Sequence, residues 1–567
     1  IRVGLTRLDN TAVLPNSHYN QNTANLGANL NISKKLKAEV TASYTNYNRK
    51  NTPDIGSENS WAKFMIHGMS RDYKPLEFDM YKNADGSKNI FDQTTPFRFY
   101  PYNNNSFKDL FWNLYEHNQE LTRNQLLGSL KLSADLTPWL NVTGRASMNY
   151  ATTDIESKYT PIDAGGVRGQ YGLENTKNQN FNFELFTTLH KENIVKDVNA
   201  SLLIGNAALR NRMHNLSAWN NGETTPFTLP YKYFLANTTG TLPAAKELWG
   251  DYDLNSLFGV LDLSYKNYLF LQVSGRNDWS STLPVKTASY FFPSGSLSFV
   301  FTEAIKGMQD INWLSYGKLK VSAAQSANGA LPYQTNYTYS SYVISNYLNT
   351  EEINSPTSFG GVPVRRVEKI LPPADLLVPQ RNRSYEVGLE LGFLNNRINT
   401  EITYYQTKAT SQIMSGSLAL SSGAQSITFN SGALSNRGVE FIVRATPVQK
   451  TNLRWDVTLN AAHNKNKVLS LSEGIDRYPL QDLWAGNGVQ MYVEVGQDYG
   501  SIYGYDYTYK NGQRVVEKIL DKNDPTKVVG TRYVTTTDPV VIGNATPKLA
   551  GGLGNSLRYK NFSLYVL

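Results

Sequence analysis

The chain has 567 residues and a formal net charge of +8, with Lys and Arg scattered along it instead of gathered in one basic block, so nucleic-acid binding is not expected. It contains no cysteine, which excludes disulfides, thiol nucleophiles and Cys-ligated zinc. No run of roughly 18 apolar residues occurs, so the chain could cross a bilayer only as strands.

From the N-terminus onward, apolar and polar residues alternate with a period of two in paired segments. Each pair predicts an antiparallel hairpin with one apolar face, and roughly eight hairpins give about 16 strands, many near the roughly 10 residues that a tilted membrane strand needs. No amphipathic helix is predicted. The paired segments are 26–32 with 36–44, 126–136 with 140–150, 181–189 with 198–204, 257–265 with 268–273, 385–393 with 398–404, 439–445 with 455–461, and 553–559 with 562–566.

The connections between the predicted strands are of two sorts. Short turns such as Lys34-Lys35, Asn395-Asn396 and Lys560-Asn561 alternate with long polar segments. A membrane barrel separates loop lengths in this way, because its periplasmic turns are short and its extracellular loops are long. The long segments lie near 50–123, 206–252, 328–380 and 465–545.

Aromatic residues accompany these segments, and tyrosine is abundant, with 36 copies. In a barrel they would form the girdles at the two membrane interfaces, although aromatics also favour strands of any kind. The apolar side would face lipid, and residues such as Asp456 and Asn460 would line the lumen. The aromatics expected at strand ends are Tyr44, Tyr47, Tyr150, Tyr265, Tyr268, Tyr404, Tyr405, Tyr559 and Phe562.

No constellation of catalytic residues is found, and we predict no catalytic residue, no metal site and no cofactor. Four acidic residues on predicted strands, Glu386, Glu390, Glu401 and Glu440, could mimic a glycosidase carboxylate pair. Acidic residues on barrel strands more commonly face a water-filled pore, and we expect these four to influence solute passage. The six histidines are far apart, without His-Glu-x-x-His spacing: His18, His67, His117, His190, His214 and His463.

The candidate binding surface is the aromatic content of the long loops. Aromatic rings can stack on the C–H faces of sugars, and peptides use similar platforms, so residue chemistry leaves both ligand classes open. Packing inside a loop or against a partner protein is the alternative role for each ring. The candidate substrate-binding residues are Trp112, Tyr115, Trp219, Tyr231, Tyr233, Trp249, Trp484 and Tyr492.

Four sets of motifs stand out in the C-terminal half: 385–388 with 395–397 and 404–405, 435–440 with 446–447 and 455–468, 500–505, and 542–548 with 551–553. They resemble the SusC/RagA class of TonB-dependent outer-membrane transporters, whereas the N-terminal half resembles it by pattern only. Trp279 and Ala324 stand where the class usually has glycine. Residues 511–538 lack the acidic Asp-x-Asn-x-Asp-Gly loop of many members, so no calcium-like site is expected there.

The resemblance implies an all-β, transmembrane antiparallel barrel of about 22 strands with a plugged lumen. It implies a TonB-dependent importer of a bulky nutrient, either oligosaccharide or oligopeptide, and not an enzyme. Its expected partners are a SusD-like surface lipoprotein, TonB and outer-membrane lipid, in a dimer of transporter and lipoprotein pairs. We expect residues 1–567 to be a barrel portion that lacks the N-terminal plug and the first and last strands.

Two other functions remain open from the sequence. A non-transporting outer-membrane barrel or adhesin would bind surfaces through its loops. A soluble β-rich carbohydrate-binding protein would use similar aromatics without a membrane.

Overall fold

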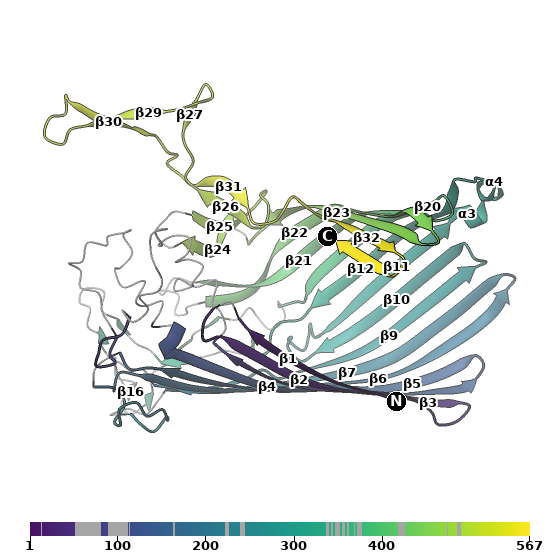
Figure 1. Ribbon diagram of the computed structural model, residues 1–567, viewed down its shortest axis with the longest axis horizontal. Coiled ribbons are helices and arrows are strands. Elements are labelled where there is room, and N and C mark those ends of the chain that lie inside the picture. The colour runs from purple at the N-terminus through teal and green to yellow at the C-terminus, as the bar shows by residue number, and fades with distance from the viewer. Residues whose placement is uncertain are drawn as a thin grey trace. The chain divides into compact units, whose positions relative to one another are not determined.

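The computed structural model (Figure 1) describes most of the chain as antiparallel sheet. By internal contacts the chain divides into a first unit, Ile1–Thr187 with Gly205–Asn255, and a second unit, Thr188–Ile204 with Ser256–Leu567. The described residues are 1–12, 14–51, 81–88, 112, 114–162, 165–220, 226–238, 244–335, 377–417, 426–472, 474–484 and 489–567, together with short strand pieces between 339 and 370.

The first unit is built from long antiparallel strands that pair in chain order. β1 pairs with β2, β2 with β3, β3 with β4 and β4 with β5, and the ladder continues through β6 and β7 to the short strand β8. The end of the β6–β7 hairpin, residues 188–204, belongs to the second unit. The bounds are β1 Arg2–Thr11, β2 His18–Asn31, β3 Leu36–Lys50, β4 His117–Thr137, β5 Leu140–Tyr159, β6 Gln170–Val195, β7 Val198–Trp219 and β8 Ala244–Trp249.

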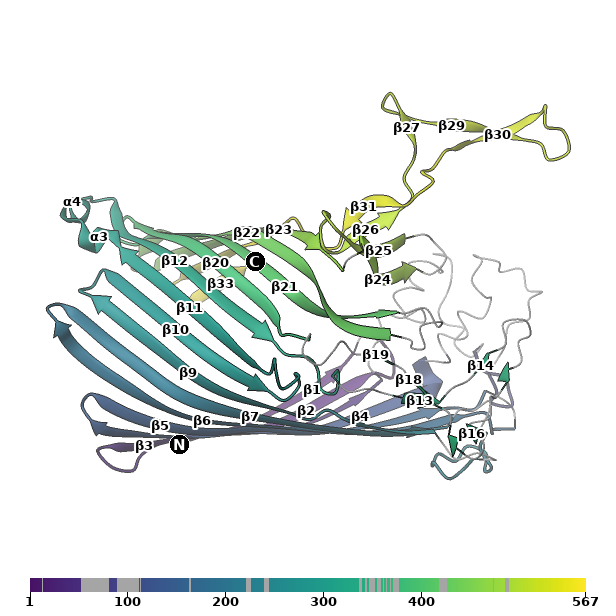
Figure 2. The same cartoon turned by 180° about the vertical axis from the view of Figure 1, so that it is seen from behind.

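The second unit is also built from antiparallel strands, and Figure 2 shows β10, β11, β12, β20 and β21 side by side. Two four-residue helices, α3 and α4, connect β11 to β12. The bounds are β9 Tyr252–Tyr265, β10 Leu269–Ser280, β11 Ser289–Val300, α3 Phe301–Ala304, α4 Lys306–Gln309, β12 Leu314–Asn328, β20 Gln380–Phe393, β21 Ile398–Ser417, β22 Ser426–Lys450, β23 Leu453–Ser470, β32 Leu549–Tyr559 and β33 Phe562–Val566.

Shorter strands lie in the connections of the second unit. β24, β25, β26 and β31 form a four-stranded sheet, and two hairpins, β27–β28 and β29–β30, lie in sequence between β26 and β31. The bounds are β13 Tyr339–Ser341, β14 Ile344–Ser345, β15 Glu352–Ile353, β16 Ser358–Phe359, β17 Val362–Pro363, β18 Arg365–Val367, β19 Lys369–Ile370, β24 Arg477–Trp484, β25 Val489–Glu494, β26 Ser501–Gly504, β27 Tyr509–Lys510, β28 Gln513–Arg514, β29 Val516–Leu520, β30 Val528–Tyr533 and β31 Val540–Asn544.

The register gives the sheet of the second unit an apolar face that is exposed. Val387 of β20 lies opposite Tyr404 of β21, which lies opposite Val439 of β22, and these side chains are 49%, 44% and 41% exposed. Since directly opposite residues share a face, this row and the row two residues on, which contains Leu389 and Ile402, form a continuous apolar surface. A water-soluble sheet would cover such a surface.

The opposite face of the same strands is polar. Lys320 Nζ lies 3.0 Å from Glu390 Oε1 and is also paired with Glu401, while Lys318 Nζ lies 3.4 Å from Glu390. The two carboxylates therefore share one lysine partner, Lys320, across β12, β20 and β21. Their arrangement is that of a structural ion-pair network.

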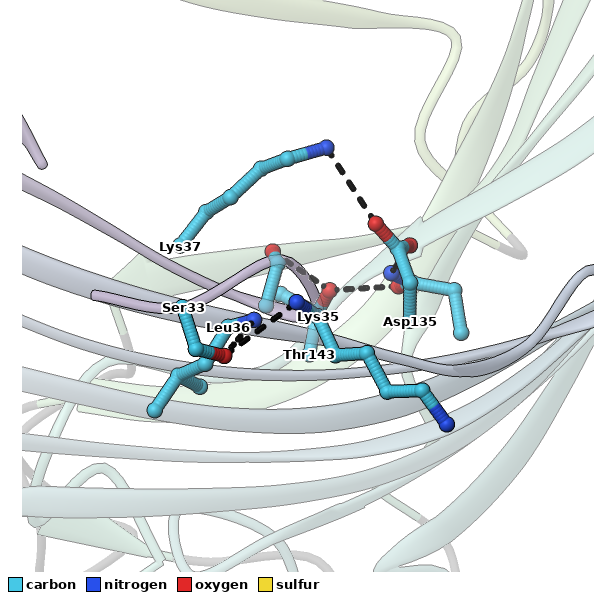
Figure 3. Close-up of polar contacts among 8 residues, drawn as sticks. Ser33, Lys35, Leu36, Lys37, Asp135 and Thr143 are labelled. Atoms are coloured by element: carbon cyan, nitrogen blue, oxygen red, sulfur yellow. Dashed lines mark hydrogen bonds and ion pairs between the residues drawn. The ribbon is translucent and has the colours of Figure 1, made fainter. Parts of the chain in front are cut away.

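The short turns are held by local hydrogen bonds, as Figure 3 shows for the β2–β3 turn. The backbone N–H groups of Lys35 and Leu36 donate to Ser33 Oγ at 3.2 and 3.0 Å. Beside the turn, Lys37 Nζ donates to the Asp135 carboxylate of β4 at 3.2 Å. The Ser33 hydroxyl thus accepts hydrogen bonds from turn N–H groups that have no backbone acceptor in a tight reversal.

The predicted hairpins are present, but several strands run further than predicted. β5 reaches Tyr159 instead of residue 150, and β7 reaches Trp219, so the predicted loop 206–252 begins only after that residue. The extensions carry polar residues on both faces, so the apolar alternation ends before the hydrogen-bonded ladder does. As a result Tyr44, Tyr150 and Tyr404 lie within strands, and their prediction at strand ends was wrong.

Five described strands of the large sheet were not predicted, namely β1, β8, β11, β12 and β19. The prediction of a single long loop over 465–545 was also wrong, because this segment contains the end of β23, the four-stranded sheet and the two hairpins. Most of the predicted loops 50–123 and 328–380 lies outside the described residues. Among the described residues, no helix has the length and apolar character needed to cross a membrane.

Candidate solute-binding site

Two of the predicted aromatics, Trp112 and Tyr115, belong to a packed cluster that precedes β4. Trp112 is completely buried, its ring edge-on to Tyr81 at a centroid distance of 6.3 Å, and Tyr81 stacks on Tyr115 at 5.9 Å. Lys82 Nζ lies 5.9 Å from the Trp112 ring centroid and 2.8 Å from Glu116 Oε1. The indole N–H of Trp112 has no acceptor among the described residues. Trp112 is therefore an anchor of this cluster and not an open platform.

Tyr233 is likewise packed inside its loop. Its ring lies edge-on to Phe227 at 5.6 Å and tilted against Tyr171 at 6.4 Å. Burial raises the pKa of the Tyr233 phenol; a hydrogen bond with Thr160 opposes this rise and the charge of Glu116 adds to it. Because Glu116 also pairs with Lys82, the loop around Tyr233 lies beside the Trp112 cluster.

Tyr231, Trp219 and Trp249 are more open. Tyr231 is 43% exposed and adopts a left-handed φ of 55°, and its ring packs over Gly166, where a Cβ would lie only 2.2 Å from Tyr231 Cε2. Trp249, at the end of β8, lies 4.2 Å from the ring of His214, and His214 Nε2 lies 2.8 Å from Glu247. Trp219 ends β7 and is 44% exposed. These three rings can offer faces to a solute.

The last two predicted residues lie in the second unit. Tyr492 of β25 lies edge-on to Tyr503 at 5.2 Å, with the Arg477 guanidinium 4.6 Å from its ring. Tyr503 donates its hydroxyl hydrogen to Glu494, and burial, followed by this bond, raises the pKa of Tyr503. Trp484 ends β24, and its side chain lies outside the described part of the molecule. Tyr492 is therefore packed against its neighbours in the four-stranded sheet.

A cleft that the sequence analysis missed lies on the polar face of the second unit. It has a volume of about 500 Å³ and crosses five strands, with Ala324, Ser384, Thr407, Asn436 and Asn466 opposite one another in one row. None of the described residues that line it carries a formal charge. The lining is Ala324, Ser326, Asn382, Ser384, Thr407, Ala409, Leu434, Ser435, Asn436, Asn464, Asn466, Tyr499 and Thr546.

The amide groups of this cleft are held by neighbouring residues. Tyr405 donates its hydroxyl hydrogen to Asn464 Oδ1 at 3.2 Å, and the backbone N–H of Tyr499 donates to Asn466 Oδ1 at 2.5 Å. Asn436 Oδ1 is buried and accepts no hydrogen bond from the described residues. A buried acceptor without a donor costs free energy.

Gly438 explains why this cleft can form. A Cβ at this position would lie 2.5 Å from His463 O, 2.6 Å from Tyr405 Oη and 2.7 Å from Tyr405 Cζ. Only glycine lets the Tyr405 ring lie across β22 and reach Asn464. The Asn436-Arg437-Gly438 stretch and the alternating Asn464 and Asn466 were the available signal, which we had interpreted only as family motifs.

Comparisons with known proteins agree with this architecture. A TonB-dependent receptor of Formosa agariphila is 28% identical over 345 residues, covering 58% of this chain and 33% of that protein. TonB-dependent receptor SusC of Bacteroides thetaiotaomicron is 26% identical over 325 residues, covering 54% of this chain and 30% of that protein. The aligned part of the chain therefore spans about a third of the length of these curated relatives.

The fold is also similar to the solved structure of the RagAB peptide transporter, with a TM-score of 0.74 and 19% identity over 99% of this chain and 59% of that chain. Residues 68–566 match the family described as TonB dependent receptor-like, beta-barrel. These matches confirm the predicted all-β barrel class and the resemblance to SusC and RagA. The chain belongs to the TonB-dependent receptor-like β-barrel family.

Proposed function

We propose that this chain forms the barrel wall of an outer-membrane importer for a bulky nutrient, energised through TonB. The exposed apolar rows through Val387 and Ile402, backed by a polar face with Lys320 and Glu390, carry the proposal. In a bilayer the first face meets acyl chains and the second lines a wet path. A soluble carbohydrate-binding protein would leave the apolar rows in water, at a large cost in free energy.

The proposed solute contacts are the cleft and the open aromatic rings of the loops. The cleft presents amides and hydroxyls without charge, which favours a neutral, hydroxyl-rich solute over one with charged ends. We therefore propose a neutral oligosaccharide as the first candidate and an oligopeptide as the second. The similarity in fold to a structure described as a peptide transporter supports the second candidate.

Binding by the cleft can be tested with Asn436→Leu and Asn464→Ala in the full-length protein. Both changes remove amide partners, so binding of neutral oligosaccharides in isothermal titration calorimetry should weaken by about tenfold. Asn460→Ala is the matched control, because Asn460 lies on the same face of β23, outside the cleft lining. Unchanged affinity in both cleft variants would exclude the cleft as a contact surface.

Active transport is tested by uptake of a labelled solute into cells of the source bacterium. Deletion of the TonB-contact segment of the full-length protein should abolish uptake while leaving surface binding intact. Uptake that persists after this deletion would contradict energy coupling through TonB.

We also propose that the transporter assembles with a SusD-like surface lipoprotein, in a dimer of such pairs. This part of the proposal rests on family resemblance and not on a surface of the described residues. Affinity purification of the tagged full-length protein in mild detergent should recover a lipoprotein in equal amount. A transporter that purifies alone and imports its solute would contradict the partnership.

A further inference from the structure

Six basic side chains lie on one face of four adjacent strands of the second unit. Each is an even number of residues from Val387 or from a residue in its row, namely Tyr404, Val439 or His463, so all six lie on the face that carries Val387 and Tyr404. All six are exposed: Arg381 and Arg383 of β20, Lys408 of β21, Arg437 of β22, and Lys465 and Lys467 of β23. We call these six residues the basic strip.

The register brings like charges directly opposite each other within the basic strip. Arg383 lies opposite Lys408, and Arg437 lies opposite Lys465. Like charges that face each other across an antiparallel pair are destabilising unless an anion lies between them. In the described part of the chain, Arg383 donates to Gln325 at 3.0 Å, and no carboxylate lies within ion-pair distance of any of the six.

The basic strip occupies a defined level on the strands. Arg383 is four residues from Val387, roughly 13 Å along an extended strand, and on the side away from the short Asn395-Asn396 turn. The strip thus follows the exposed apolar rows at the end where the long connections lie. Guanidinium and ammonium groups at this distance from the apolar band would reach the level of lipid headgroups.

We propose that the basic strip binds the phosphate groups of lipid headgroups in the outer leaflet, an inference that rests on the membrane location in the proposed function but goes beyond import. Arginine pairs with phosphate through two parallel N–H donors, and lysine adds a point charge. Two opposed cation pairs on neighbouring strands can hold a diphosphorylated headgroup, because each of its two phosphates would neutralise one pair. Among the described residues of β3–β5, the positions just beyond the apolar rows on the corresponding face hold Asn46, Asn124 and Asp154 instead of opposed cations.

The test compares the full-length protein with the combined variant Arg383→Gln, Lys408→Gln, Arg437→Gln and Lys465→Gln. The matched control is Lys510→Gln, Lys518→Gln, Lys522→Gln and Lys527→Gln, which removes four exposed charges between β26 and β31. The probe is diphosphorylated lipid A, added to detergent-solubilised protein and followed by native mass spectrometry. The strip variant should bind it at least about tenfold more weakly than the wild type and the control.

Two further arms identify the bound group and its source. Enzymatically dephosphorylated lipid A should bind as weakly to the wild type as intact lipid A does to the strip variant. Inorganic phosphate at the same concentration should not displace the lipid. Equal binding to all three proteins, or displacement by phosphate alone, would overturn the assignment.

Membrane insertion and solute uptake are measured on the same variants. If the wild type fails to insert or to import, the proposed function fails. If insertion and uptake are normal while lipid binding is unchanged by the four substitutions, only the role of the basic strip is refuted.

Discussion

Replacing Gly438 with alanine is the sharpest test of how the cleft is built. The new methyl group would lie 2.5 Å from His463 O and 2.6 Å from Tyr405 Oη, distances that real Cβ atoms essentially never show. One of these contacts is backbone, so the clash cannot be relieved by moving Tyr405 alone. The β22–β23 ladder must shift, or the ring of Tyr405 must leave its place.

The expected cost has two parts. Overpacking of a tightly packed site costs about 1–3 kcal/mol, and losing the hydrogen bond from Tyr405 to Asn464 costs about 1 kcal/mol. We therefore expect the free energy of unfolding to fall by about 2–4 kcal/mol. Solute affinity should fall as well, since Asn464 lines the cleft.

Urea-induced unfolding of the full-length protein in lipid vesicles, followed by tryptophan fluorescence, measures this change. Gly144→Ala is the control, because no atom lies within 4 Å of a Cβ built at that strand position. Double substitution of Gly438→Ala with Tyr405→Ala should recover part of the loss, but the contact with His463 O should prevent full recovery. Equal stability of Gly438→Ala and Gly144→Ala would refute this reasoning.

Three further predictions concern the two faces of the sheet and the first unit. Ile402→Lys should lower the free energy of unfolding in vesicles by about 2 kcal/mol, because it puts a charge against lipid. Thr403→Lys on the polar face should change this free energy little. Equal effects of the two substitutions would contradict the assignment of faces. Lys320→Met should cost about 1–2 kcal/mol, as it removes the cation shared by two carboxylates, and a neutral result in urea titration would mean that the ion pairs contribute nothing. The raised pKa of Tyr233 means that its contribution to stability is complete below the unfolded pKa near 10 and is lost as pH rises through the folded value. When the melting temperature is measured as a function of pH, Tyr233→Phe should therefore reduce its fall at alkaline pH. An unchanged fall would exclude Tyr233 as a cause of the alkaline loss of stability.

The sequence predicted the hairpins because lipid on one face of the sheet and water on the other make apolar and polar residues alternate along each strand with a period of two. This is why the hairpin of β20 and β21 was predicted with the correct turn, Asn395-Asn396, whose residues adopt φ of 57° and 58°. Both strands extend further from that turn than predicted, β20 from Gln380 and β21 to Ser417. Beyond the apolar band both faces meet water, so the period vanishes while the backbone ladder continues. The extension of β5 to Tyr159 could not be predicted for that reason.

The site was less predictable than the fold. Aromatic loop residues look alike in sequence whether they anchor a cluster, as Trp112 does, or remain open, as Trp249 does, because burial depends on contacts distant along the chain. The cleft depends on register, which aligns Ser384, Thr407 and Asn436 from three strands. Asn464 and Asn466 were visible as an alternating pair, but their neighbours across the sheet were not.

The central claim is that alternate residues of these strands face lipid and water. Because this chain has no cysteine, the single substitutions Glu401→Cys, Ile402→Cys, Thr403→Cys and Tyr404→Cys each place one thiol in it for a fluorescent label. The labelled protein is the membrane-embedded, full-length protein, in which any cysteine outside this chain is replaced with serine. Lipid-dissolved nitroxide should quench the labels at 402 and 404, and an aqueous quencher those at 401 and 403. Uniform quenching at all four positions, or quenching only by the aqueous reagent, would contradict the account.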